Sequence, residues 1–257
     1  MRVKIIFNIQ TQEHALPHYH QNLLAAWVAA IKIKSNRWCD YTHYNFSSLR
    51  GQTVSQKAGL NYINQKVMLV FSSPEQDFID FFVAQIFGQP TWRLGPLHLI
   101  PKHIYQEPPI QLSGSVKYLC ISPLVPSWNV LQNQKAGKML VHPQQDTFSD
   151  LLYECTIANM ERSGMYHADA LSSFFKFQLV PDQSYLSRLK EQGKLFARTH
   201  PIFYQDREYE TRTYIFPFTL HADPEVQAYV HTHGLGAFTQ QGLGMIDARH
   251  TGGESSD

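Results

Sequence analysis

The sequence lacks the features of membrane, disulfide-rich and zinc-binding proteins. Its longest apolar runs, such as Val67–Phe71, have the length of a strand, whereas a membrane span needs about 18–20 apolar residues. It has only three cysteines, Cys39, Cys120 and Cys155, which are far apart and form no CxxC pair. We therefore expect no membrane partner, no disulfide framework and no zinc site. A reducing cytoplasm is the default location for such a chain.

Two further features are missing, namely a signal peptide and a charge excess. The run Met1–Phe7 reads as a first strand, because no small-residue cleavage site follows a long apolar stretch. The 22 Lys and Arg residues nearly balance the 21 Asp and Glu residues, which leaves a net charge of +1. This balance weighs against a strongly electrostatic nucleic-acid binder. Basic residues nevertheless concentrate in positions 1–50, which hold six Lys and Arg against two acidic residues.

The apolar content, 43% of the residues, is enough for a packed core and excludes wholesale disorder. The first half alternates segments typical of strands and of helices. The expected strands and helices are a strand at 2–10, a helix after Pro17, a strand within 40–49, a strand at 66–72, a helix after Ser73-Pro74 that ends at Gly88, and a strand or hairpin at 91–105, with a polar connector at 51–65. This β-α-β-β-α-β order predicts a ferredoxin-like domain.

A proline-rich stretch, Glu107-Pro108-Pro109, marks the expected domain boundary. A second, decorated unit of the same type follows. Its expected segments are a strand at 116–121, a helix at 148–162, a strand at 174–180, a helical or mixed segment at 183–196, an extended stretch at 202–220, a helix after Asp223-Pro224 and a short last strand at Ile246. The predicted fold class is α+β, with two tandem ferredoxin-like domains at 1–108 and 109–250 and a flexible tail at 251–257.

The sharpest motif is a glycine-rich loop between the last helix and the last strand. Gly234, Gly236, Gly242 and Gly244 fall within eleven residues. Glycine permits positive φ and close backbone approach, and exposed N–H groups in such a loop can bind phosphate. The loop is not a Walker loop, since no Lys-Ser/Thr follows it. It is not a Rossmann fingerprint either, because it follows a helix and precedes a strand.

This G-x-G-x(5)-G-x-G pattern resembles the glycine-rich loop of the RAMP superfamily, the CRISPR-associated RNA-binding proteins. Two N-terminal motifs resemble the repeat-processing endoribonuclease branch of that superfamily. Leu16–Trp27 is similar to its first helix, with a proline, a polar-aromatic turn and a glutamine, and Tyr44–Leu49 is similar to its aromatic strand.

The resemblance implies a tandem ferredoxin-like protein that binds CRISPR repeat RNA and cuts the precursor transcript into crRNA, with no metal and no other cofactor. The ribose 2′-OH would attack the adjacent phosphorus and leave a 2′,3′-cyclic phosphate and a free 5′-OH. Such a reaction needs a base, an acid and a cation, and histidine suits the first two roles. Other CRISPR effector subunits and a second copy of the chain are further possible partners.

His43 is the first candidate for the acid or base, because the family commonly places a histidine between the first helix and the aromatic strand. His20 is the second candidate, although a capping or packing role suits it better. The tyrosine that many relatives carry near the end of the first helix is missing, since Trp27 and small apolar residues stand there. Tyr41 or Tyr44 could replace it, and without a replacement the protein would bind RNA and cut slowly or not at all.

Several basic residues are candidates for holding RNA phosphates or for stabilising the transition state. Lys32, Lys34, Arg37 and Arg50 flank His43 in the sequence, and Arg207 and Arg212 lie in a second basic segment interleaved with aromatic residues. For each residue a solvated or ion-paired surface position is an equally simple interpretation. The pair His231 and His233 could suggest a metal, but their i, i+2 spacing at a helix end points them apart and no third ligand is obvious, so we expect no metal there.

Three hypotheses remain open on the sequence alone. The first is the metal-independent endoribonuclease. The second is a non-catalytic RAMP subunit that holds guide RNA in a CRISPR effector complex. The third is a ligand-binding or assembly module in which the glycine loop has only a structural role, which the near-zero net charge mildly favours.

Overall fold

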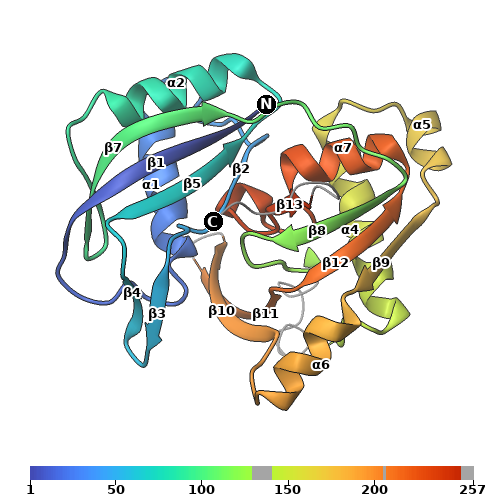
Figure 1. The fold of residues 1–257 in the computed structure, drawn as a ribbon. Helices are drawn as coiled ribbons and strands as arrows, with labels where there is room; N and C mark the ends of the chain where they lie inside the picture. Colours follow the sequence, from blue (N-terminus) through green and yellow to red (C-terminus); the bar gives the residue numbers. More distant parts are fainter. Residues whose placement is uncertain (129–140, 205–206, 250–257) are drawn as a thin grey trace.

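The computed structural model describes residues 1–128, 141–204 and 207–249. Two antiparallel sheets lie side by side, and each carries helices on one face (Figure 1). The predicted tail at 251–257 lies outside the described residues. Within them, no helix is long and apolar enough to cross a membrane.

The first half folds in the predicted β-α-β-β-α-β order. Its elements are β1 (Arg2–Gln12), α1 (Gln21–Lys32), β2 (Asn45–Phe46), β3 (Thr53–Gln56), β4 (Gly59–Tyr62), β5 (Lys66–Ser72), α2 (Gln76–Phe87), β6 (Trp92–Leu94) and β7 (Leu97–Gln106). The main sheet has the order β2-β5-β1-β7-β6. The first strand is therefore central, as in a ferredoxin-like fold.

Two predictions for this half were wrong in detail. The segment at 51–65, expected to be a connector, contains the β3–β4 hairpin. This hairpin is attached to the chain before α1, because Leu16 and Leu60 exchange two backbone hydrogen bonds of 2.9 and 2.7 Å. Gly59 makes this approach possible, since a Cβ at its φ of 144° would collide with the Leu16 carbonyl. The other difference is β2, which has only two residues of the longer strand expected there.

The second half repeats the pattern with insertions. Its elements are β8 (Ser115–Cys120), α4 (Asp146–Ser163), α5 (Ala168–Ser173), β9 (Phe177–Pro181), α6 (Gln183–Glu191), β10 (Ala197–Tyr204), β11 (Arg207–Tyr214), β12 (Pro217–Ala222), α7 (Pro224–His233), the short 3-10 helix η2 (Thr239–Gln241) and β13 (Ile246–Ala248). The sheet order β13-β8-β12-β9 again places the first strand of the unit inside the sheet. The predicted extended stretch at 202–220 comprises parts of three strands, of which β10 and β11 form a separate hairpin.

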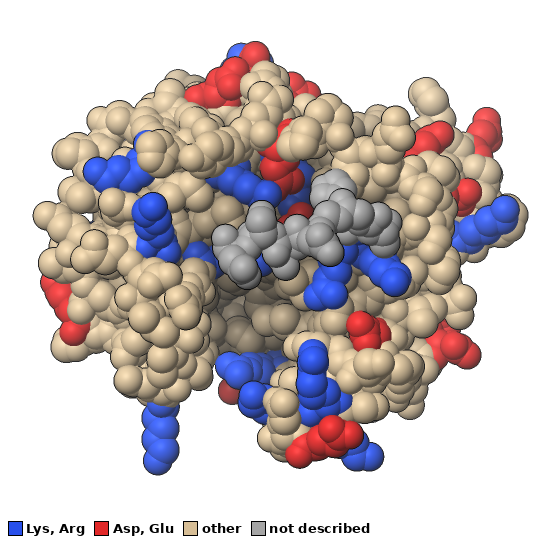
Figure 2. All heavy atoms as spheres, in the orientation of Figure 1, with Lys and Arg blue, Asp and Glu red and all other residues tan. Residues whose placement is uncertain are grey.

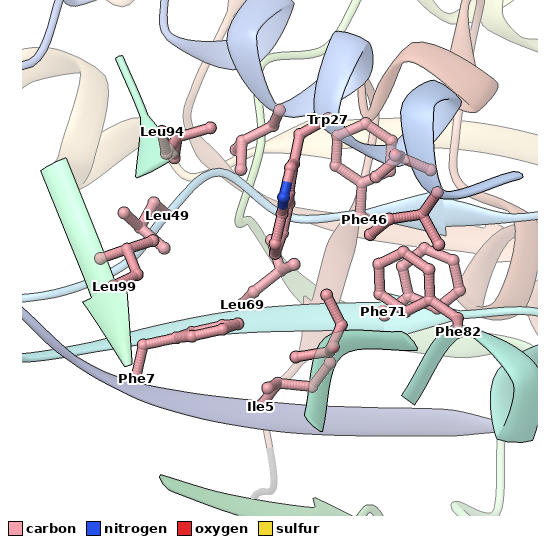
Figure 3. Close-up of a cluster of buried hydrophobic side chains, with 14 of the residues drawn as sticks. Ile5, Phe7, Trp27, Phe46, Leu49, Leu69, Phe71, Phe82, Leu94 and Leu99 are labelled. Atoms are coloured by element: carbon pink, nitrogen blue, oxygen red, sulfur yellow. The ribbon is translucent and has the colours of Figure 1, made fainter. Parts of the chain in front are cut away.

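Each sheet packs its own apolar core against its helices. In the first core, Trp27 of α1 lies between the helix and the sheet (Figure 3). Its ring meets those of Phe7, Phe82 and Trp92 edge-on, with centroids 5.2–6.3 Å apart. The first sheet ends at Gln106 and the second begins at Ser115, and the domain boundary at 108 itself stays a prediction.

The stacked pair Phe71 and Phe82 gives a test of this core. Their rings lie 3.9 Å apart at 6° and neither side chain is exposed. We expect Phe71→Ala to lower the free energy of unfolding by about 3–5 kcal/mol, because it opens a cavity between α2 and the sheet. Phe175, 72% exposed, supplies the control, since Phe175→Ala should stay within about 0.5 kcal/mol of wild type. Urea unfolding measures both, and equal losses in the two variants would contradict this description.

Candidate active site at the glycine-rich loop

The glycine-rich loop is buried between the two halves of the molecule. All four glycines have positive φ, between 71° and 91°. An added Cβ would collide with Asn45 at Gly234, with the Val125 carbonyl at Gly236, with Phe46 at Gly242 and with the Leu235 carbonyl at Gly244. The glycines are therefore required by backbone conformation and by close packing.

The N–H groups of this loop are largely used inside the protein. Those of Gly234, Gly242 and Gly244 donate to the carbonyls of Val230, Thr239 and Pro123. They are not free to hold a phosphate, so the predicted phosphate cradle is not supported at these three positions. RNA contact by the loop glycines stays a prediction.

Two side chains of the first half tie the loop to the first sheet. Asn45 Nδ2 donates to the carbonyl oxygens of His233 and Leu243, both at 3.1 Å. Gln21 Nε2 donates to the Gly242 carbonyl at 2.7 Å. Since Gln21 begins α1 and Asn45 begins β2, the loop holds the start of that helix and that strand together.

The contribution of the two Asn45 hydrogen bonds can be tested by measuring the free energy of unfolding. We expect Asn45→Ala to lower the free energy of unfolding by about 1–3 kcal/mol, because two buried carbonyl groups lose their donor. The control is Asn64→Ala, because Asn64 is exposed and its Nδ2 donates to Gln52 Oε1 on the surface. A variant at Asn45 as stable as the one at Asn64 would show that the tie contributes nothing measurable.

His43 lies directly before β2, next to the tied loop. Its side chain is half-buried, and its ring centroid is 5.6 Å from that of Tyr41 and 6.4 Å from that of His233. Ser73 Oγ donates to the His43 carbonyl at 2.9 Å, and the Tyr41 hydroxyl donates to Ser73 Oγ, also at 2.9 Å. The backbone that carries His43 is therefore held on one side by the Tyr41–Ser73 pair and on the other by Asn45.

Tyr41, predicted to be catalytic, has the features of a positioning residue. Its hydroxyl proton is committed to Ser73, and burial raises the pKa of the phenol. A raised pKa makes the phenol a weaker acid at neutral pH. The geometry thus argues against proton transfer to RNA by Tyr41 and supports a role in orienting His43. Tyr44 is buried in the core and burial raises its pKa too, so the geometry also argues against Tyr44 as a replacement for the missing tyrosine.

His20, the other predicted catalytic histidine, is built into the structure. It is 5% exposed, its Nδ1 donates to the Pro17 carbonyl at 3.1 Å, and its Nε2 accepts from the Leu49 N–H at 3.3 Å. Burial lowers its pKa to about 4, which keeps the ring neutral. With both nitrogens occupied, His20 joins the start of α1 to the chain after β2, and this geometry argues against the predicted catalytic role.

The sequence reasoning missed His233 as a neighbour of His43. As expected for an i, i+2 pair, the two α7 histidines diverge: His231 Nδ1 lies 3.2 Å from Arg2, whereas His233 faces His43. His233 Nδ1 donates to the Tyr229 carbonyl, so its buried Nε2 carries the lone pair, which no described residue contacts by a hydrogen bond. Only the position of His233 at the start of the glycine loop could have signalled this proximity. In the described residues no group of three or more His, Cys, Asp or Glu could hold a metal ion.

The basic candidates separate into different places. Lys32 is buried at the end of α1 with its Nζ 4.9 Å above the ring of Tyr44, the residue after His43, and burial lowers its pKa. Lys34 lies over the Trp92 ring instead, and Arg37 forms an exposed ion pair of 2.8 Å with Asp77. The geometry therefore favours Lys32, among these three, as a cation near His43.

Arg50, Arg207 and Arg212 have other surroundings. Arg50 is 3.8 Å from Asp247 and lines a cavity of about 560 Å³ beside β5. Arg207 and Arg212 are on β11 of the separate hairpin. Figure 2 shows this face of the molecule hollowed between the two halves, with Lys and Arg side chains on both sides of the hollow and over the hairpin below it.

Three buried histidines predict a pH dependence of stability. Burial lowers the pKa of His20, His200 and His233 to about 4, against about 6.5 in the unfolded chain. Between these two pKa values the unfolded chain binds more protons than the folded chain. The free energy of unfolding therefore has its full value above about pH 6.5 and decreases as the pH falls toward about 4. Urea unfolding across this window measures the slope. His200→Asn should reduce the slope, His221→Asn at an exposed site should not, and a flat wild-type curve would contradict the prediction.

Comparison with solved structures identifies the fold. A structure titled "CRISPR associated protein Cas6" matches with a TM-score of 0.70 and 19% identity over 97% of this chain and 99% of that one. One titled "An RAMP protein binding different RNA substrates" gives 0.72 and 15%, over 97% and 100% of the two chains. A Cas6-related protein of Pyrococcus furiosus gives 0.74 and 14%, over 98% and 99%. At these identities the likeness shows the fold, which is the tandem ferredoxin-like fold of RAMP proteins.

The particular family follows from the sequence match. The family model described as "CRISPR associated protein Cas6, C-terminal" matches residues 106–248, which is more than half of the chain. The chain therefore belongs to the Cas6 family of CRISPR-associated proteins. No curated protein matches it. Membership supports a role in CRISPR RNA processing or binding, and the predicted fold class is confirmed.

Proposed function

We propose that this chain is a metal-independent endoribonuclease that binds CRISPR repeat RNA and cuts the precursor transcript into crRNA. The observation that carries the proposal is the position of His43. It is a half-buried imidazole whose backbone is held by Ser73 and by the Asn45 tie to the glycine loop. A fixed but accessible imidazole suits proton transfer at neutral pH.

In the proposed reaction the ribose 2′-oxygen forms a bond to the adjacent phosphorus, and the bond from phosphorus to the 5′-oxygen breaks. His43 either takes the proton of the 2′-OH or gives a proton to the departing 5′-oxygen. Lys32 supplies positive charge for the phosphorane oxygens from the end of α1, where its ammonium is largely withdrawn from water. The products are a 2′,3′-cyclic phosphate and a 5′-OH.

A second candidate function is that of a non-catalytic subunit that holds guide RNA. The observation that favours it is that none of the residues considered for the role of the missing tyrosine has a free phenol in the described part of the chain. Trp27 of α1 is committed to the core, Tyr44 is buried, and the Tyr41 hydroxyl is bonded to Ser73. RNA binding is common to both functions, and only the cutting step separates them.

The test is cleavage of the repeat RNA of the same genome in EDTA. We expect wild type to cut, and His43→Ala to lose about 100-fold or more of the rate while binding RNA as tightly as wild type. His221→Ala, at an exposed histidine of β12, is the matched control and should cut normally. A 2′-deoxy at the scissile position should block the reaction.

Each other outcome has one meaning. Cutting that survives His43→Ala would remove His43 from the mechanism. Loss of cutting by the wild type in EDTA would overturn metal independence. Tight binding without cutting would establish the guide-RNA subunit, and no binding at low salt would overturn both functions.

A further inference from the structure

A cavity of about 540 Å³ lies where α1, the β10 strand and the glycine loop meet. Its lining from α1 includes Leu23 and three alanines, and Phe203 lines it from β10. Tyr44 and the amide-bearing residues Asn22, Gln240 and Gln241 make up the rest of the lining. The cavity thus combines an aromatic ring, an apolar wall and a few polar groups, which is the usual composition of a small-ligand site.

The exposure of Phe203 is the notable feature of the cavity, because an exposed ring adds little to the core. It is 52% exposed, although its neighbour Ile202 on β10 is 1% exposed and serves the core. The side chain thus lines the cavity while about half of it stays accessible to solvent. An open aromatic face beside an apolar wall suits a flat ligand that stacks on it.

The amides are oriented so that they offer acceptors. Asn22 Nδ2 donates to the Pro201 carbonyl at 3.1 Å, and Gln241 Nε2 donates to the Phe203 carbonyl at 2.8 Å. Because a backbone carbonyl only accepts, these bonds fix which end of each amide faces β10. In the described part of the chain the Oδ1 of Asn22 and the Oε1 of Gln241 accept no hydrogen bond. A flat ligand with N–H donors on its edge would satisfy them.

The surroundings favour a nucleotide over an apolar molecule or a peptide. Tyr44 lines the cavity, and the Lys32 ammonium lies 4.9 Å above the Tyr44 ring, so a cation is available for an attached phosphate. The glycine loop connects the cavity to the candidate active site, because it starts at His233, which faces His43, and passes through Gln240 and Gln241. A purely apolar ligand would leave the amide oxygens without partners.

We propose that this cavity binds one unpaired base of the substrate RNA, close to the scissile phosphate. The base stacks on Phe203, and its exocyclic amino group donates to Asn22 or Gln241. Adenine, cytosine and guanine carry such an amino group and uracil does not. Uracil offers only its ring N3–H as an edge donor, so the cavity favours an amino-bearing base, and it holds the chain so that the next phosphate reaches His43. This inference deepens the proposed function and rests on it.

The experiment combines an RNA series with one protein variant. Repeat RNAs that each lack a single base, with the ribose kept, are scanned across the region around the cut with wild type and with Phe203→Ala. We expect one position at which loss of the base weakens wild-type binding by about 5- to 150-fold, the range for stacking of one base on an aromatic side chain. Phe203→Ala should lose a similar factor on intact RNA and nothing further when that same base is missing.

Two controls separate stacking from folding. Phe203→Tyr keeps the ring and should bind as wild type, while Phe175→Ala removes an exposed phenylalanine on the chain before β9 and should have no effect. Thermal unfolding checks that Phe203→Ala is folded. Replacing the identified base by uracil should cost part of the same factor.

Different results would overturn this inference and the proposed function. If the Phe203→Ala and missing-base effects add at every position, or if Phe203→Ala binds intact RNA as wild type does, the base pocket is wrong. The cleavage that depends on His43 would stand in that case. If no RNA binds, or if His43→Ala cuts normally, the proposed function fails first.

Discussion

The site depends on one set of hydrogen bonds, those by which Asn45 and Gln21 hold the carbonyls of the glycine-rich loop. The loop belongs to the second half of the chain, and its two partners belong to the first. Because all these groups are buried, breaking the contact would leave polar atoms without partners in an apolar interior, which costs more than the bonds themselves contribute. The tie therefore fixes how the end of α7 faces the start of β2. That relation sets the two imidazoles of His43 and His233 beside each other.

This arrangement gives separate physical reasons for three motifs that are far apart in the sequence. The glutamine of the first helix and the asparagine of the aromatic strand are donors to the loop, and Phe46 packs where Gly242 has no Cβ. The glycines are needed because the loop must be left-handed at four places and almost free of side-chain volume. Because its backbone groups are largely bonded within the protein, the loop positions the side chains around it. His43 and Lys32 are the side chains proposed to act on RNA.

The fold could be predicted well because its signals are local. The β5 strand and the α2 helix follow directly from an apolar run and from a Ser-Pro start, and the repeated β-α-β-β-α-β order gave the class. The β3–β4 hairpin was missed because its exposed strand has no apolar alternation and its place is set by Leu16. The catalytic roles stay predictions. The structure adds that His43 lies near His233 at the start of the loop, whereas His20 and Tyr41 have their polar atoms committed to Leu49 and Ser73.

The sequence by itself determined the two sheets, the helices that cover them, the glycine loop and the membership of the chain in its class. The sheets, helices and loop follow from periodicity, capping residues and glycine spacing, which act over a few neighbouring residues, whereas the class was implied by the resemblance of three motifs to a known family. Only the tertiary structure decided which side chains from distant parts of the chain meet at the site. His233 faces His43 across 190 residues of chain, and Phe203 reaches α1 from an inserted hairpin. Such contacts depend on how two separately packed sheets meet, and no local pattern encodes that geometry.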